Sequence, residues 1–172
     1  AKDLLHAFEE KDPTASELVA RHFPEAATGN LQLTGAQLVI ARHHGFSSWA
    51  QLRAEVDRVN LGKLLHAVEH GNVRQARELL RKRPELATMN VAEHDEHRAL
   101  HLAVLRRDAG MVRALMQAGA DAHQGIYPHR DATTAYLFAQ ERGFADITEA
   151  IDEEERFRRE NLSCPNATVS PL

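Results

Sequence analysis

The sequence predicts an all-α protein in which pairs of short helices recur along the chain. Hydrophobic residues make up 43% of the 172 residues but aromatic residues only 5%, which favours thin packing between helices over a large β-sandwich. Three similar segments also follow one another at an interval of 36 residues. A fixed interval of this length is typical of repeat architectures.

The composition also excludes several classes of function. The formal net charge is −4 and the charges are spread evenly, so we expect no dedicated nucleic-acid binding. The single cysteine, Cys164, cannot form an internal disulfide. No apolar run approaches the ~20 residues that would span a bilayer. We therefore expect a cytoplasmic monomer that does not insert into a membrane.

The three segments share an alanine and a turn position. An alanine stands four residues before the anchor of each segment, and the anchors are Gly71, Arg107 and Gly143. Glycine suits a left-handed C-terminal helix cap, because it has no Cβ that would clash. Since Arg107 breaks this rule, we expect its turn either to be strained or to have a different shape.

Each segment therefore predicts a short helix, a tight turn and a second helix. The alanine lets neighbouring helices approach closely, and Asn72 and Asp108 are residue types that cap a following helix. The first helices are expected at 63–70, 99–106 and 134–142, and the second helices at 73–82, 109–117 and 145–158. The polar stretches 88–97 and 121–131 are expected to be extended loops or hairpins.

The middle segment resembles a known repeat. Arg98-Ala-Leu-His-Leu-Ala103 is similar to the Thr-Pro-Leu-His-x-Ala signature of ankyrin repeats, and Gln117-Ala-Gly-Ala-Asp121 resembles the Gly-Ala-Asp that ends such a repeat. Pro84-Glu-Leu-Ala87 replaces that ending in the first segment, as in bacterial ankyrin proteins. Leu65 and Leu137 stand where the family has histidine. The resemblance covers residues 60–153 and implies an ankyrin-type helical solenoid of about three repeats over 61–160.

The first 60 residues are expected to form an N-terminal helical cap, because the terminal faces of a stacked array need covering. Asp12-Pro13 is a strong helix start, and that helix is expected to end near Phe23-Pro24. Residues 36–58 look like a degenerate repeat anchored at Gly45, in which Ser47 or Ser48 caps the second helix and Trp49 packs inside. The region also resembles the leader of some bacterial ankyrin proteins.

The last residues are expected to differ from the repeats. Residues 152–160 are dominated by charged side chains and predict a solvated helix extension, and residues 161–172 predict a polar tail or linker. No C-terminal cap can be identified in this stretch. We therefore expect the natural chain to continue beyond Leu172, with more repeats or with another domain.

Metal binding and catalysis are both disfavoured. His97 and His101 have the i, i+4 spacing that zinc ligands on one helix use, but the resemblance places His101 at a structural position that bonds to backbone near the next repeat's turn. No nucleophile elbow or phosphate-binding loop is present, and Cys164 has no neighbouring base. We expect no enzyme activity, no cofactor and no bound metal.

The candidate site follows from stacking the segments. In ankyrin-like arrays the first helices and the connecting loops form the concave face that binds partners. The equivalent positions give three columns: His66, Leu102 and Phe138; Glu69, Leu105 and Glu141; and His70, Arg106 and Arg142. Arginine beside apolar and aromatic side chains is typical of binding hot spots. Alternatively, the glutamates pair with their neighbours, and Leu102 and Phe138 are packed between repeats.

The loops supply the remaining candidate residues, which are His94 in the first loop and Tyr127, His129 and Arg130 in the second. We expect the protein to bind a protein partner through the inner helices and these loops, with the arginines meeting carboxylates of the partner. A regulatory or positioning role within a longer, possibly enzymatic, polypeptide is the alternative. Metal or pH sensing by the histidines is a third hypothesis.

Overall fold

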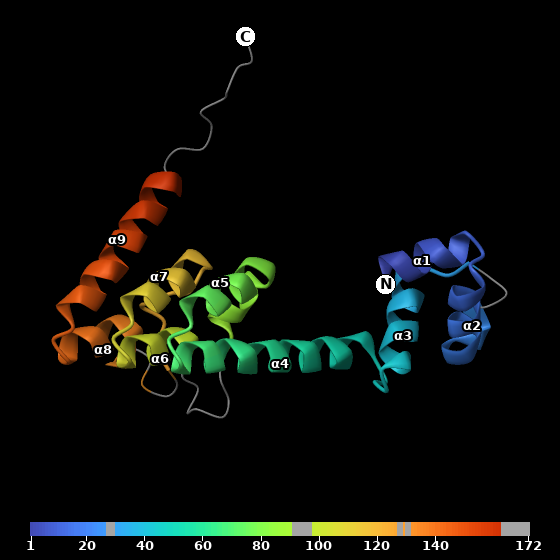
Figure 1. The fold of residues 1–172 in the computed structure, drawn as a ribbon, viewed down its shortest axis with the longest axis horizontal. Coiled ribbons are helices and arrows are strands. Elements are labelled where there is room, and N and C mark those ends of the chain that lie inside the picture. The colour runs from blue at the N-terminus through green and yellow to red at the C-terminus, as the bar shows by residue number, and fades with distance from the viewer. Residues whose placement is uncertain (27–29, 91–97, 127–128, 130–131, 163–172) are drawn as a thin grey trace, which may run out of the picture. The chain divides into compact units, whose positions relative to one another are not determined.

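The computed structural model confirms the all-α prediction. It describes residues 1–26, 30–90, 98–126, 129 and 132–162 (Figure 1). These residues contain helices and no strand, and an antiparallel bridge between Asn90 and Arg98 is the only β-type pairing among them. None of the described helices combines the length and the hydropathy that crossing a membrane requires.

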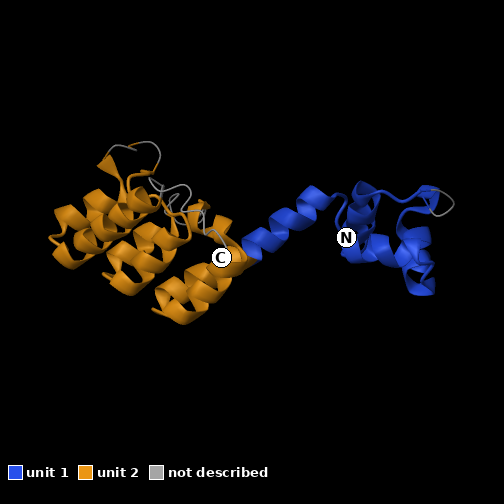
Figure 2. Cartoon of the chain, turned by 90° about the horizontal axis from the view of Figure 1, so that it is seen from above, with its two compact units in different colours: residues 1–59 blue, residues 60–172 orange. Residues whose placement is uncertain are grey.

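The helices follow one another with short connections. In chain order they are α1 (Lys2–Glu9), α2 (Pro13–His22), α3 (Leu33–His43), α4 (Trp49–Glu69), α5 (Val73–Lys82), α6 (Ala99–Leu105), α7 (Ala109–Gln117), α8 (Ala135–Glu141) and α9 (Ala145–Leu162). Two short 3-10 helices, η1 (Pro24–Ala26) and η2 (Pro84–Thr88), follow α2 and α5. The chain divides into two compact units, 1–59 and 60–172, and the boundary falls within α4 (Figure 2).

The second unit is built in two layers. The C-terminal part of α4 lies in one layer with α6 and α8, and α5, α7 and α9 form the other (Figure 1). Within the layers α6 contacts α8, and α7 contacts both α5 and α9. Five fully buried side chains at the centre are Leu64, Leu100, Met111, Leu115 and Ile151. We call the layer of α4, α6 and α8 the inner layer and the other the outer layer.

The three predicted turns share one backbone geometry. The φ angles of Gly71, Arg107 and Gly143 are 64°, 53° and 65°. In each turn the anchor amide donates to the carbonyl three residues earlier, and the next amide donates to the carbonyl of the alanine four residues before the anchor, over 2.8–3.1 Å. This pair of bonds is the Schellman motif that ends many helices. The predicted caps are thus confirmed, and the Arg107 turn has the ordinary shape at the cost of a strained backbone.

The side chain of Arg107 links two turns. Its Nε lies 2.9 Å from Oδ1 of Asp146, and its guanidinium stands 5.2 Å from the centre of the Phe144 ring. Phe144 lies in the turn between α8 and α9, and Asp146 lies in the first turn of α9. A left-handed backbone costs a non-glycine residue about 1–2 kcal/mol, and these exposed contacts offset part of that cost.

Substituting glycine or alanine for Arg107 separates the cost of the strained backbone from the contribution of the side-chain contacts. We expect Arg107→Gly to be about 1 kcal/mol more stable than Arg107→Ala, because both lose the Asp146 contact and only glycine relieves the backbone strain. Urea unfolding followed by circular dichroism measures the difference. Gly143→Ala is the matched control and is expected to lose a similar amount. An Arg107→Ala variant as stable as Arg107→Gly would contradict the strained turn.

The first helix pair repeats the local sequence of the pair 60 residues later, a similarity that the 36-residue period does not predict. Leu4-Leu-His-Ala7 returns as Leu64-Leu-His-Ala67, and Pro24-Glu25 returns as Pro84-Glu85. The turn between α1 and α2 also uses the Schellman bonds, with Lys11 in the left-handed position at φ 60°.

The N-terminal caps of the helices after these two turns, α2 and α5, use the same hydrogen bond. Asp12 accepts a bond from the amide of Ala15 at the start of α2, and Asn72 accepts one from the amide of Gln75 at the start of α5. The N-terminal unit therefore contains a helix pair of its own before α3, and α1 was absent from the predicted elements. The predicted helix from Pro13 to the Phe23 region is confirmed as α2.

The expected break before residue 63 does not occur. We predicted a degenerate repeat that ends at 58 and a separate helix from 63, whereas α4 runs continuously from Trp49 to Glu69. Gly62 weakens a helix by only about 1 kcal/mol, and no proline interrupts this stretch. Ser48 caps α4 by accepting from the amide of Gln51, as expected. Trp49 is half-buried and does not belong to either buried core cluster.

The predicted solvated extension is packed on one side. Helix α9 continues to Leu162, and Glu154 near its middle is only 8% exposed. Its carboxylate accepts from Nε2 of Gln117 at 2.8 Å, and Arg158 donates to the carbonyl of Ala120 at 2.9 Å. These bonds to the end of α7 and to the residues after it hold Glu154 buried and Arg158 half-buried, although their sequence pattern places both in solvent.

Candidate functional site

The inner layer carries the nine helix-associated residues of the candidate site. His66 and Glu69 lie on α4, Leu102 and Leu105 on α6, and Phe138 and Glu141 on α8, while His70, Arg106 and Arg142 directly follow these helices. The structure thus places one member of each predicted column on each inner helix or directly after it. Leu102 and Phe138 are half-buried and pack against the core, so the alternative of packing between helix pairs holds for these two.

Two exposed histidines stack at the end of α4. The ring centres of His66 and His70 are 4.1 Å apart and the ring planes differ by 22°. Nδ1 of His70 also lies 2.8 Å from the carbonyl oxygen of His66, which fixes it as a donor. Glu69 stands between them in sequence, and it forms no ion pair or hydrogen bond with another described side chain. The alternative that Glu69 pairs with a neighbour is therefore not supported within the described chain.

The end of α6 presents an apolar and a cationic side chain together. Leu105 is 37% exposed, and it belongs to a small set of large apolar side chains with this exposure. Arg106 follows it as the C-terminal cap residue and is exposed. Among the described residues, no ion pair or side-chain hydrogen bond engages its guanidinium. This end of α6 can therefore offer a partner both burial of a leucine side chain and a free guanidinium.

The end of α8 has a different arrangement. The guanidinium of Arg142 stands 5.4 Å from the centre of the Phe138 ring, and its Nη1 is 3.5 Å from the Phe138 carbonyl oxygen. Phe138 in turn meets the His101 ring edge to face at 5.7 Å. The guanidinium of Arg142 is thus already engaged by Phe138 of the helix that precedes it. Glu141 is exposed and, within the part of the chain described, has no ionic partner.

His101 is a structural residue, as the sequence predicted. Its side chain is fully buried, its Nδ1 accepts from the Arg98 amide at 3.3 Å, and its Nε2 lies 3.0 Å from the Thr133 carbonyl oxygen. The second bond links α6 to the turn before α8. Both ring nitrogens are therefore occupied by backbone groups, and His101 is not available as a metal ligand. His97, the other member of the proposed zinc pair, lies outside the described residues.

The loop candidates are mostly outside the described chain. His129 is described and exposed, and the Thr133 hydroxyl donates to its carbonyl at 2.8 Å. His94, Tyr127 and Arg130 lie outside the described residues. The loop prediction therefore stays a prediction for these three residues.

The last helix pair is polar at three positions where the previous pair is apolar. Three buried residues of the previous pair, Val104, Val112 and Met116, correspond at the 36-residue interval to Gln140, Thr148 and Asp152, which are exposed or half-exposed. The last helix pair therefore differs in polarity from the previous pair at these equivalent positions.

The hydroxyl of Tyr136 on α8 lies close to carboxylates of α9. Burial raises the pKa of the Tyr136 hydroxyl, and the neighbouring Asp152 carboxylate raises the same pKa further. The Tyr136 ring lies 5.0 Å from the ring of His123, whose Nε2 is 3.0 Å from a carboxylate oxygen of Glu155. These contacts fasten α8 and α9 to the chain after α7 and leave Tyr136 as a neutral hydrogen-bonding group.

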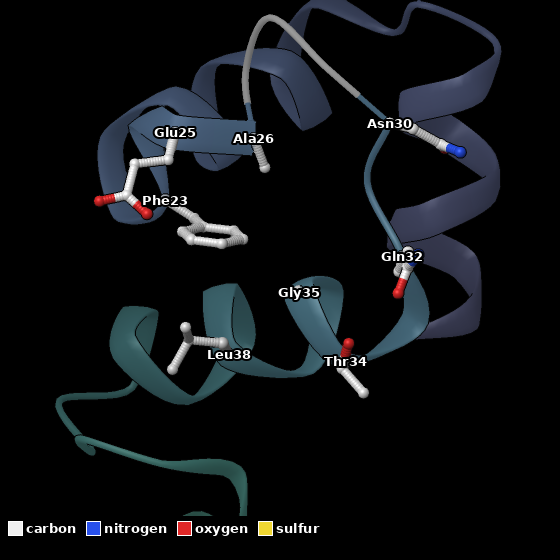
Figure 3. A pocket seen from close by; sticks show the side chains of 8 residues that line it. All are labelled: Phe23, Glu25, Ala26, Asn30, Gln32, Thr34, Gly35 and Leu38. Carbon is white, nitrogen blue, oxygen red and sulfur yellow. The ribbon is translucent and has the colours of Figure 1, made fainter.

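The N-terminal unit contains a hollow that the sequence did not reveal. It lies between η1 and α3 and has a volume of about 450 Å³ (Figure 3). Phe23, Ala26 and Leu38 provide apolar lining. Gly35 lets the chain close around the phenylalanine, because a Cβ there would lie 3.2 Å from Cε1 of Phe23 and 2.9 Å from Cδ1 of Leu31. Glu25 is the charged residue of this lining, and it lies at the exposed edge of the hollow.

Comparisons of the chain with protein-family models, with curated proteins and with solved structures found no match in any of the three.

Proposed function

We propose that the protein is a non-catalytic interaction module, built as a short ankyrin-type stack of helix pairs, that binds a protein partner on its inner layer. Three observations support the stack. The Schellman turns recur every 36 residues, the helices of the second unit form two layers, and His101 bonds to the turn before the next pair. In such a stack the core is buried between pairs, so the inner layer is free for recognition.

The observation that carries the binding proposal is the exposed Leu105 beside the unengaged Arg106. Burying a leucine stabilises a complex through the apolar area removed from water, and a guanidinium can bind a carboxylate with two hydrogen bonds. Glu69 and Glu141 add exposed carboxylates on the neighbouring helices. The partner surface is therefore expected to combine an apolar side chain with a carboxylate, flanked by basic groups.

The double variant Leu105→Ala/Arg106→Ala tests this surface. The wild-type chain is immobilised, proteins retained from a lysate of the source cell are identified by mass spectrometry, and the Kd of each purified partner is then measured. Removing both side chains is expected to raise the Kd of the partner at least about thirtyfold, because hot-spot residues contribute about 2 kcal/mol or more to binding.

The matched control is Arg53→Ala/Val56→Ala on α4, which removes an exposed arginine and a valine that is 40% exposed. This control is expected to keep the partner, and circular dichroism checks that both variants are folded. A partner that binds wild type and both variants equally would place recognition elsewhere. A partner that binds neither double variant would show that binding is not specific to Leu105 and Arg106.

A further inference from the structure

The outer face of α5 carries arginines that differ in their pairing. Arg74, Arg77 and Arg81 are exposed and follow one another at intervals of three and four residues, so they share one side of the helix. Nε of Arg74 lies 3.6 Å from Oε1 of Glu78. Within the described chain, Arg77 and Arg81 take part in no ion pair, hydrogen bond or ring contact. Two guanidinium groups one turn apart are therefore available to an anion.

Both unengaged arginines line two hollows on the outer layer. The first lies along α5 and has a volume of about 510 Å³. The second, of about 320 Å³, extends from α5 to α7 and is lined by Leu80, Ala114 and Ala118 as well. Because Arg77 and Arg81 border both hollows, the two form one continuous surface, which we call the α5–α7 groove. The groove thus combines free cations with an apolar lining.

The charge of this region is opposite to that of the whole protein. The segment from Val73 to Glu85 has five cations (Arg74, Arg77, Arg81, Lys82 and Arg83) against two anions (Glu78 and Glu85), a net charge of +3. The chain as a whole carries −4. A local cationic groove on an acidic protein attracts a negatively charged partner to that place and not to the rest of the surface.

We propose that the α5–α7 groove binds an acidic peptide segment in which apolar side chains alternate with carboxylates. The guanidinium groups of Arg77 and Arg81 would each donate hydrogen bonds to a carboxylate, and the apolar side chains would occupy the hollow lined by Leu80 and the alanines of α7. A nucleic acid fits less well, because strong phosphate binding uses more cations than two and gains little from an apolar lining. The groove lies on the outer layer and is independent of the inner-layer surface.

The probe is a fluorescein-labelled peptide of alternating glutamate and leucine residues, and fluorescence anisotropy measures its Kd for the full chain. Arg77→Gln/Arg81→Gln is expected to raise this Kd about tenfold, since each charged contact on a partly exposed surface is worth up to about 1 kcal/mol. Lys63→Gln/Arg156→Gln removes the same net charge from two exposed cations outside the groove and is expected to change the Kd less than twofold.

Two further probes separate the alternatives. A peptide with glutamine in place of glutamate is expected to bind at least tenfold more weakly than the acidic peptide. A labelled oligothymidylate is expected to bind more weakly than the acidic peptide and to be insensitive to Arg77→Gln/Arg81→Gln. Absence of binding by the acidic peptide to wild type overturns the proposal. Equal weakening by both double variants, or tighter oligothymidylate binding through the two arginines, overturns it as well.

Discussion

Replacing His101 with alanine is expected to lower the free energy of unfolding of the second unit by about 3–4 kcal/mol. The side chain is fully buried, so its removal leaves a cavity inside the unit. It also removes the partners of two backbone groups, the Arg98 amide and the Thr133 carbonyl. An unsatisfied buried backbone group costs about 1–3 kcal/mol, and this cost adds to that of the cavity.

Guanidinium unfolding followed by circular dichroism measures this loss. His66→Ala is the control, because His66 is an exposed histidine on the neighbouring inner helix and is expected to change stability by less than about 1 kcal/mol. His101→Gln is expected to fall between wild type and alanine, since its amide can still donate to the Thr133 carbonyl. If His101→Ala were as stable as His66→Ala, the two backbone bonds would not hold the helix pairs together.

The turns could be predicted because their determinants are local. An alanine, three intervening residues and a glycine specify both Schellman bonds within six residues, as at Gly71 and Gly143. Even Arg107 could be placed, because the spacing around it matches the glycine turns. The sequence could not decide whether this turn was strained or reshaped, since the decision depends on Asp146 and Phe144, which lie almost 40 residues further along.

The elements that were missed depend on distant contacts. The packed side of α9 is held by Gln117 and by the carbonyl of Ala120, which are 37 and 38 residues from their partners Glu154 and Arg158. A run of charged residues on its own predicts a solvated helix, because it contains no sign of those partners. The continuous α4 is not indicated by the repeats either, because a 36-residue period assigns each unit a first helix of its own.

The candidate site shows the same limit. Leu102 and Leu105 are both leucines of α6, but the first packs against the core and the second is 37% exposed. Arg106 and Arg142 occupy equivalent positions, and only Arg142 stacks on a ring, because Phe138 occupies the position that Leu102 has in the previous pair. A single sequence aligns these positions but does not show which side chains a neighbour covers.

Replacing Ala103 with leucine is expected to lower the stability of the second unit by about 2–3 kcal/mol, because the inner helix has no space for three more carbon atoms. Ala103 is fully buried in α6, as are its equivalents Ala67 and Ala139. Its carbonyl also accepts the Schellman bond from the Asp108 amide at 3.1 Å, so a shift of this helix would disturb the turn. Thermal unfolding is expected to show a fall in Tm of roughly 5–15 °C.

The control for size alone is Ala145→Leu at the exposed start of α9, which is expected to change Tm by no more than about 2 °C. A third variant, Ala103→Gly, separates crowding from loss of helix propensity, since it adds no atoms and is expected to cost about 1 kcal/mol. If Ala103→Leu unfolded at the same temperature as wild type, the inner helices could separate without loss. The alanines would then reflect helix propensity alone, and close approach between helix pairs would no longer explain their positions.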